Sequence, residues 1–205
     1  MVTMFLSLLE AVWPTECVGC DRLHHGRLCP DCQPDGAARI SAPEGIVMAF
    51  ALAPYPDPLG RAVRRAKYGR DRGLAVYLGG LAPLFSHKLP AADLVVPAPS
   101  TPGSRAHRGF CMASILGAGI AATHNQRPAE LLSVGRGSRQ AAVTRRDRSR
   151  NLRGRITCIA DLGGAHVVLV DDVVTTGATA TACADALWLA GAGRVSLAVW
   201  CAAKN

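Results

Sequence analysis

Aromatic residues are scarce in this chain: Phe, Trp and Tyr make up only 5% of its 205 residues. The core must therefore be built mainly from valine, alanine and leucine, within a hydrophobic fraction of 49%. Such a fraction can bury a sizeable core without disulfides, which excludes the small scaffolds that depend on them. The length allows one α/β domain of about 150 residues together with a small appendage.

The sequence also lacks a long hydrophobic run near its start. Residues 1–13 are apolar but few, include Glu10 and have no basic segment before them. A secretory signal begins with a basic stretch, and a membrane span needs about 20 apolar residues. We therefore expect an amphipathic helix over residues 1–13, no membrane span, and a protein that stays in the cytoplasm.

Two common nucleotide-binding motifs are missing. No G-x-x-x-x-G-K-[ST] sequence occurs, and Gly191-Ala192-Gly193 is not followed by the third glycine of a dinucleotide fingerprint. Acidic residues are fewer than basic ones: the sequence has 15 Asp and Glu and 23 Lys and Arg, which gives a net charge of +8. This charge suits phosphorylated ligands or nucleic acid but specifies neither.

Four of the eight cysteines form two closely spaced C-x2-C pairs, which are Cys17, Cys20, Cys29 and Cys32. Each pair can grip a metal ion from a tight turn, and two pairs complete a tetrahedral zinc site that has no open position. We therefore expect a structural zinc ion. His24 or His25 could replace one thiolate. Two disulfides are the other alternative, which a reducing cytoplasm disfavours.

The most informative segment is residues 167–179, where an apolar run, two acids and a turn of small residues follow one another. The apolar run predicts a buried strand that ends at Asp171 and Asp172, and residues 180–190 predict a helix. Ligands of open α/β sheets bind beyond the carboxyl ends of the strands. The turn would present hydroxyls and N–H groups to a phosphate, and the acids suit ribose hydroxyls or a magnesium-bound polyphosphate. A purely structural strand–turn–helix is the alternative.

Strands that alternate with helices predict a parallel sheet with right-handed crossovers. We expect strands over residues 46–53, 93–96, 156–159, 167–170 and 195–202, and helices over residues 61–68, 74–85, 110–122 and 180–190. Residues 35–44 are predicted to be a linker. In the basic helix, Val63 and Ala66 should face inward. Lys67 is expected on the solvated face, although it could point at the ligand pocket.

Residues 171–179 closely resemble the phosphoribosyl-pyrophosphate (PRPP) signature of type I phosphoribosyltransferases. The resemblance implies that Asp171 and Asp172 are the catalytic acids, contact the ribose hydroxyls and act with Mg²⁺ on the pyrophosphate. It also implies that the turn holds the 5′-phosphate, through Thr175, Thr176, Gly177, Ala178 and Thr179.

Residues 96–110 look like the V-P-x-P…R-x-x-R-G-F motif of the ComF family, whose members carry a phosphoribosyltransferase domain behind a four-cysteine finger. The resemblance covers nearly the whole chain. It implies a helix and zinc finger at residues 1–40, and a Rossmann-like, type I phosphoribosyltransferase-like α/β domain at residues 41–205. Two departures stand out: Cys111 and Met112 replace the family's N-Q, and residues 153–155 lack an expected aromatic.

In type I transferases, the loop after the corresponding strand binds pyrophosphate. The resemblance therefore implies this role for Pro97, Ala98, Pro99 and Ser100. Arg105 and Arg108 could supply charge to the same group, because guanidinium forks bind phosphate oxygens bidentately. For both arginines, solvation of the loop is the alternative.

Residues 133–155 carry eight arginines and a single acid, Asp147. Type I transferases keep a flexible hood in this part of the chain, which implies that Arg139 and Gln140 face the ligand. The rival interpretation is a nucleic-acid patch centred on residues 145–150, although no aromatic residue in the segment could stack on bases. A solvated loop that binds nothing is the third alternative.

The residues and the two resemblances predict a PRPP-binding protein that transfers a phosphoribosyl group to an unknown acceptor, and the resemblance to the ComF family implies an association with DNA uptake in competence. The alternative is a non-catalytic accessory protein that binds single-stranded DNA, a competence helicase, or both. The finger is expected to dock a partner or a second subunit rather than to take part in the chemistry.

Overall fold

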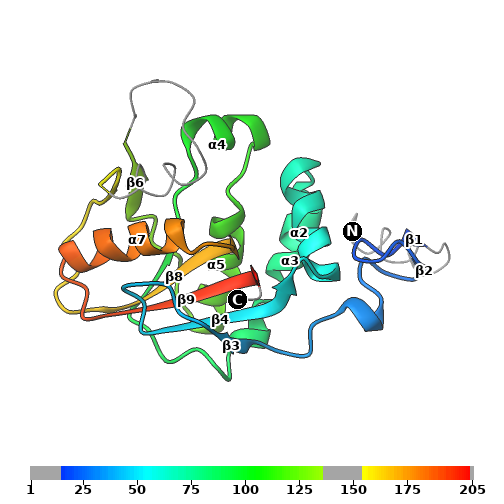
Figure 1. The fold of residues 1–205 in the computed structure, drawn as a ribbon, viewed down its shortest axis with the longest axis horizontal. Coiled ribbons are helices and arrows are strands. Elements are labelled where there is room, and N and C mark those ends of the chain that lie inside the picture. The colour runs from blue at the N-terminus through cyan, green and yellow to red at the C-terminus, as the bar shows by residue number, and fades with distance from the viewer. Residues whose placement is uncertain (1–14, 136–153, 204–205) are drawn as a thin grey trace.

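The computed structural model describes residues 15–135 and 154–203 of the chain (Figure 1). The helix predicted over residues 1–13 lies outside these ranges, and so do the predicted hood residues Arg139 and Gln140. Those expectations stay predictions. Within the two ranges, no helix is both long and apolar enough to cross a membrane.

A five-stranded sheet forms the centre of the molecule, with the strand order β3-β4-β9-β8-β5. Its strands are β3 (Ala38–Ile40), β4 (Met48–Tyr55), β5 (Leu94–Pro97), β8 (His166–Val174) and β9 (Arg194–Ala203). The last four of these are mutually parallel, whereas β3 runs antiparallel to β4 at one edge. The predicted parallel α/β sheet is therefore confirmed.

Helices cover both faces of this sheet. One face packs against α2 (Pro58–Tyr68), α3 (Arg72–Gly79) and α5 (Met112–Thr123), and the other packs against α7 (Ala178–Leu189). Side chains alternate along a strand, so Val168 and Val170 of β8 belong to the first core and Val167 and Leu169 to the second. On the first face, the indole of Trp200 donates a hydrogen bond of 3.0 Å to the backbone oxygen of Leu78.

Side-chain caps set where several helices begin. Asp57 accepts from the N–H of Leu59 at the start of α2, and Asp71 accepts from the N–H of Leu74 at the start of α3. Helix α4 (Pro102–Arg108), which the sequence did not predict, begins at a Thr101 cap in the same way. These carboxyl and hydroxyl oxygens satisfy N–H groups that have no partner within the helix.

Three expectations about smaller elements were wrong. The predicted linker contains edge strand β3. Residues 156–159 do not join the parallel sheet, because β7 (Ile156–Cys158) pairs antiparallel with β6 (Leu132–Val134). The predicted helix over residues 74–85 is two elements, since α3 ends at Gly79 and a 3-10 turn, η2 (Ala82–Phe85), follows. The division of the chain into residues 1–40 and 41–205 stays a prediction.

The cysteine-rich module lies at one end of the molecule, beside α2 and α3 (Figure 1). It contains the short pair β1 (Thr15–Glu16) and β2 (Leu23–His24) and the 3-10 turn η1 (Pro30–Cys32). Its buried residues share a core with the helices of the first face; these module residues are Cys17, Leu28, Cys29 and Cys32. The module is therefore packed onto the domain rather than tethered to it.

Candidate functional site

The site is built on the segment that the sequence singled out, the strand–turn–helix of β8 and α7. Strand β8 continues through Asp171 and Asp172 to Val174, so the acids lie within the strand rather than after it. Gly177 precedes α7 in a left-handed conformation, with φ of +77°. A side chain there would also press on Pro43, whose Cβ lies 3.0 Å from the position of an added Cβ. Glycine is therefore required at this turn for two separate reasons.

The N-terminus of α7 has the form of an anion site. Its capping residue Gly177 offers no side chain to the first N–H groups. Within the described part of the chain, the only cap-like bond is a long one of 3.4 Å from Ala178 N to Thr176 Oγ1. Thr175 and Thr176 are exposed beside these donors. Unsatisfied N–H groups, neighbouring hydroxyls and the helix dipole together favour a phosphate group here.

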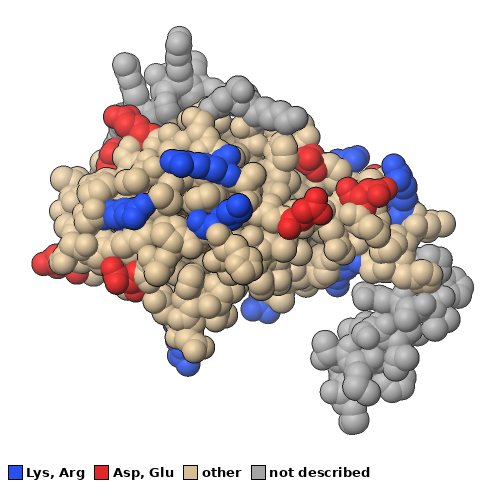
Figure 2. Space-filling view, turned by 90° about the horizontal axis from the view of Figure 1, so that it is seen from below, with Lys and Arg blue, Asp and Glu red and all other residues tan. Residues whose placement is uncertain are grey.

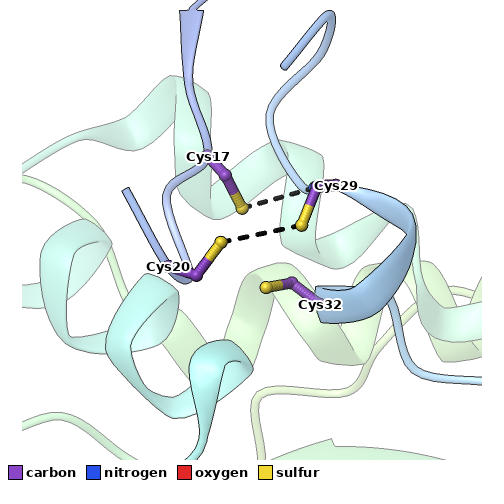
Figure 3. A group of neighbouring side chains, drawn as sticks. All are labelled: Cys17, Cys20, Cys29 and Cys32. Carbon is purple, nitrogen blue, oxygen red and sulfur yellow. Dashed lines mark hydrogen bonds between the residues drawn. The ribbon is translucent and has the colours of Figure 1, made fainter. Parts of the chain in front are cut away.

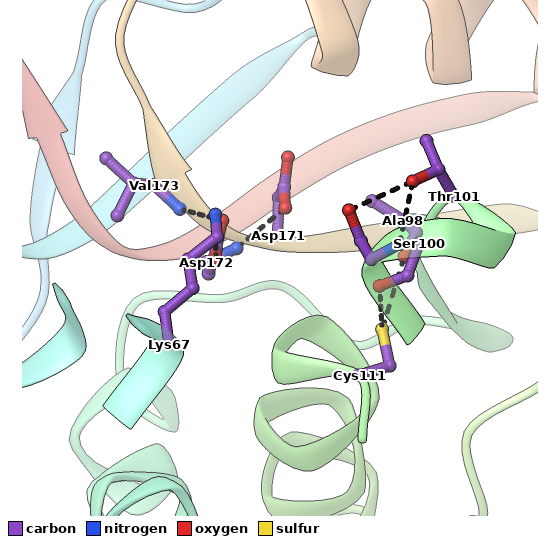
Figure 4. Close-up of polar contacts among 9 residues, drawn as sticks. Lys67, Ala98, Ser100, Thr101, Cys111, Asp171, Asp172 and Val173 are labelled. Atoms are coloured by element: carbon purple, nitrogen blue, oxygen red, sulfur yellow. Dashed lines mark hydrogen bonds and ion pairs between the residues drawn. The ribbon is translucent and has the colours of Figure 1, made fainter. Parts of the chain in front are cut away.

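The two acids have different surroundings, because neighbouring residues of a strand point to opposite faces. Asp172 is buried, and its Oδ2 lies 2.6 Å from Nζ of Lys67, while its Oδ1 accepts from the N–H of Val173 (Figure 4). Asp171 is half-buried, and its Oδ1 accepts from the N–H of Asp172 at 2.8 Å. The expectation that Lys67 lies on a solvated face was wrong, because its side chain turns inward to the acid pair.

Burial and charge shift the titration of this cluster. Burial raises the pKa of Asp171 to about 7, and the neighbouring charge of Asp172 adds to the effect. Burial on its own would lower the pKa of Lys67, but the charge and hydrogen bond of Asp172 outweigh it, and the pKa is raised. Lys67 therefore stays protonated at neutral pH, whereas Asp171 exchanges a proton there.

The predicted pyrophosphate loop follows β5, the neighbour of β8. The N–H of Ala98 is already bonded to the backbone oxygen of Val170 at 2.7 Å. Since proline has no N–H, Ser100 is the only backbone donor that residues 97–100 keep for a ligand. The hydroxyl of Ser100 donates to Sγ of Cys111 at 3.1 Å, so the cysteine that departs from the family pattern supports this loop (Figure 4).

The two predicted arginines differ in position. Arg105 lines a cavity of about 300 Å³ together with residues 97–100 and Cys111, and its guanidinium lies 3.7 Å from the exposed Glu130. Arg108 is not among the residues that line this cavity. Its Nε is buried and has no hydrogen-bond partner among the described residues. The geometry thus joins Arg105, but not Arg108, to the pyrophosphate loop.

A larger cavity, of about 520 Å³, opens on the other side of the turn. Its walls come from β3, β4, β9 and the turn itself, including residues 41–43, 51–54 and 175–177. None of the residues that line it is charged or aromatic. No sequence pattern indicated this cavity, because its walls combine four segments that lie far apart along the chain.

The four predicted metal ligands come together. The sulfur atoms of Cys17, Cys20, Cys29 and Cys32 all lie within 4.8 Å of one another (Figure 3). The N–H of Cys29 donates to Sγ of Cys17 at 3.3 Å. Burial would raise the pKa of Cys17, but backbone hydrogen bonds from Cys29, Gly19 and Cys20 outweigh it and lower the pKa to about 6. Four convergent thiols, one of them already stabilised as a thiolate, fit a tetrahedral metal ion.

The fold and this site define the class. A mostly parallel α/β sheet carries an acid pair and a phosphate-type turn at the carboxyl end of one strand, and a four-cysteine cluster precedes it. This is a mostly parallel α/β fold with an N-terminal cysteine module, as predicted from the sequence, and its acid pair and turn lie in the order that resembles type I phosphoribosyltransferases.

Proteins of similar sequence were compared next. DNA utilization protein YhgH of Escherichia coli (strain K12) is 28% identical over 194 residues, which cover 87% of this chain and 84% of that protein. The protein of the same name from Salmonella typhi is 29% identical over 196 residues, with the same coverage. The chain is thus similar over most of its length to proteins named for DNA utilization, and its motifs resemble those of the ComF family. No family model matches it.

Solved structures were also compared. A glutamine PRPP amidotransferase from B. subtilis, complexed with ADP and GMP, matches 62% of this chain with 20% identity and a TM-score of 0.44. An allosteric regulatory enzyme of purine biosynthesis matches 61% with 21% identity and a TM-score of 0.42. The chain spans about a quarter of the length of each. Likeness of this degree supports no conclusion about ligands.

Proposed function

We propose that this protein binds PRPP with Mg²⁺ at the β8–α7 segment and transfers its phosphoribosyl group to an acceptor. The observation that carries the proposal is the arrangement of Asp171, Asp172 and the uncapped N-terminus of α7 within one strand–turn–helix. Carboxylates are acceptors for sugar hydroxyls, and the helix end is a phosphate site, so the segment provides for both parts of a phosphorylated ribose.

In this proposal the turn over Thr175, Thr176, Gly177, Ala178 and Thr179 holds the 5′-phosphate, and the acids lie against the ribose. The pyrophosphate lies toward Ser100 and Arg105. Mg²⁺ fits the site, because carboxylate and pyrophosphate oxygens are the ligands it prefers, and it would neutralise the leaving group. The bond from the anomeric carbon to pyrophosphate breaks, and a bond to the nucleophile of the acceptor forms. Fixed carboxylates beside the ribose stabilise the positive charge that develops on it.

Thermal unfolding with PRPP and Mg²⁺ tests the binding, with ribose 5-phosphate and ATP as controls. At about 100 times its dissociation constant, a ligand stabilises the folded state by roughly 2.7 kcal/mol, which gives a clear shift of the midpoint. The shift should be lost in a chain that carries both Asp171→Ala and Asp172→Ala. An unchanged affinity of this double variant for PRPP would refute the assignment. Release of pyrophosphate with candidate bases and amines then tests turnover.

We also propose that the cysteine cluster holds a structural Zn²⁺ ion and that the protein works in the cytoplasm. Four thiolates leave no position for a substrate or a reactive water, so the ion would act on folding alone. Metal analysis of the purified protein should give one zinc per chain.

A second candidate function, as a non-catalytic accessory protein of DNA uptake, has in its favour that the similar proteins are named DNA utilization proteins. The net charge of +8 suits a polyanion. The face in Figure 2, however, shows separate basic groups with acids on either side rather than a continuous basic stripe. The residues proposed for this binding are Arg145, Arg146, Arg148 and Arg150, which lie outside the described residues. Binding of single-stranded DNA that disappears when these four are neutralised would favour it.

A further inference from the structure

The cavity of about 520 Å³ lies at the carboxyl ends of β4, β8 and β9, the edge of the sheet where ligands of parallel α/β folds bind. Near these ends it is lined by Pro54, Val174 and Ala203. Another part of its wall is the turn over residues 175–177, which the proposed function assigns to the 5′-phosphate. The cavity and the candidate phosphoribosyl site are therefore adjacent.

Asp171 lies on the same face of the sheet as this cavity. Side chains alternate along β8, and Val167 and Leu169 belong to the core on the α7 face. Asp171 continues this series, whereas Asp172 points to the opposite face (Figure 4). Ala51, which lines the cavity, also belongs to the core of the α7 face. A ribose held by Asp171 would therefore lie on the face that the cavity adjoins.

The order of the strands places this cavity and the pyrophosphate loop on opposite sides of Asp171. Strand β8 has β5 on one side, and the loop over residues 97–100 with its cavity of about 300 Å³ follows β5. On the other side lie β9, β4 and β3, which contribute walls to the cavity of about 520 Å³. A nucleophile that displaces pyrophosphate approaches the anomeric carbon from the side opposite the leaving group. That side is the one on which the larger of these two cavities lies.

The walls of the cavity suit an uncharged ligand. Among the described residues that line it there is no acid, no lysine or arginine and no histidine, and most are aliphatic. A carboxylate or a phosphate buried there would lose its hydration without gaining a cation, which is costly. An apolar ring would gain free energy by the same burial. The hydroxyl of Ser41, which has no part in the phosphate turn, can bond to a polar atom of such a ring.

The need for a nucleophile narrows the class of ligand further. An aliphatic amine is a cation at neutral pH, as the side chain of lysine is, whereas an aromatic ring nitrogen such as that of imidazole is largely uncharged. Only an uncharged nitrogen combines a lone pair for the reaction with a fit to walls that carry no charge. The volume of about 520 Å³ lies in the range that small ligands fill.

We infer that this cavity receives the acceptor, and that the acceptor is a small uncharged nitrogen heterocycle rather than a phosphorylated molecule or a nucleic acid. The inference rests on the proposed function for the reaction in which the acceptor takes part. The lone pair of the ring nitrogen forms the bond to the anomeric carbon, and pyrophosphate leaves with the electrons of the broken C–O bond. A proton carried by the heterocycle passes to water, so that the product ring is again uncharged.

The test uses variants that place a larger side chain in the wall of the cavity. Ala203→Leu does so at a half-buried position, and Ala42→Leu does so at an exposed position where the fold tolerates the change. Ala165→Leu is the matched control, because Ala165 is half-buried just before the amino end of β8 and does not line the cavity. The unfolding midpoint of each variant is measured first to establish that it folds.

The first measurement is the binding of benzimidazole without PRPP, by ligand-observed NMR, with benzimidazole-5-carboxylate as its anionic counterpart. The wild type and Ala165→Leu should bind benzimidazole, and should bind the carboxylate about tenfold or more weakly. Ala203→Leu and Ala42→Leu should each lose about tenfold or more in affinity for benzimidazole. Equal binding of the two probes, no binding of benzimidazole, or binding that the larger side chains leave unchanged would overturn the inference. So would a change of oligomeric state in these variants, because a second copy of the chain would then cover the cavity.

The second measurement is the release of pyrophosphate from PRPP and Mg²⁺ with benzimidazole as the acceptor. Ala203→Leu should keep the wild-type affinity for PRPP, because Ala203 belongs neither to the turn nor to the acid pair, and should release pyrophosphate about tenfold or more slowly. If the wild type binds PRPP but benzimidazole does not accelerate release, or Ala203→Leu releases it equally fast, the inference fails and PRPP binding stands. If the wild type binds no PRPP, the proposed function fails, and the binding of benzimidazole alone still decides whether the cavity takes an uncharged heterocycle.

Discussion

At the scale of the single residue, the protonation of Asp171 links the candidate site to stability. Its pKa rises from 3.8 to about 7 on folding, so between these values the folded state binds more protons than the unfolded state. Stability contributed by this group is therefore present at low pH and is lost as the pH rises from about 4 to about 7.

Removing this carboxylate should therefore stabilise the protein at neutral and higher pH. Asp171→Asn is expected to raise the midpoint of thermal unfolding more at pH 8 than at pH 4. The corresponding difference in the free energy of unfolding is on the order of 2–4 kcal/mol. Asp35→Asn, at an exposed carboxylate, is the control and should show no such pH dependence. An equal effect of Asp171→Asn at both pH values would contradict the raised pKa.

At the scale of the element, the turn between β8 and α7 depends on Gly177. Alanine there must adopt a positive φ and press on Pro43, so Gly177→Ala should destabilise the fold by roughly 1–2 kcal/mol and weaken binding of PRPP. Gly103→Ala is the matched control, because Gly103 lies in α4 with nothing near the added methyl group, and it should be neutral or slightly stabilising. Equal unfolding midpoints for the two variants would show that the turn tolerates a side chain.

At the scale of the whole molecule, the cysteine module and the domain share one core, which has a cooperative consequence. Removing the metal should lower the unfolding midpoint of the entire chain by roughly 10 °C, in one transition rather than two. Cys20→Ser should reproduce the effect and abolish the response to a chelator. Cys158→Ser, at a half-buried cysteine outside the cluster, should respond as the wild type does. A separate low-temperature transition on chelation would mean that the module unfolds on its own.

The sequence was sufficient for the parts of this molecule that depend on local pattern. The apolar runs predicted β8 and β9, the C-x2-C spacing predicted the cysteine cluster, and the small-residue turn predicted the start of α7. The sequence alone could not predict which distant segments pair with one another. Whether Lys67 meets water or Asp172 depends on how α2 lies over the sheet, and the antiparallel pairing of β6 with β7 joins strands about twenty residues apart. Helical periodicity alone placed Lys67 on the outer face, because it takes no account of a long side chain that bends back.

Strand β9 lies between β4 and β8 in the middle of the sheet, although it is the last described strand along the chain. During synthesis on a ribosome, each of its two neighbours therefore lacks a partner along one edge until residues 194–203 have left the exit tunnel. Until then β4 and β8 each present one unpaired edge and largely apolar faces to solvent, which is the form of nascent chain that aggregates or recruits chaperones. The candidate site is assembled at the same late moment, because Asp171 faces Val199 across the β8–β9 pairing. A chain stalled or cut before β9 would thus carry the complete acid–turn motif without the continuous five-stranded sheet that supports it.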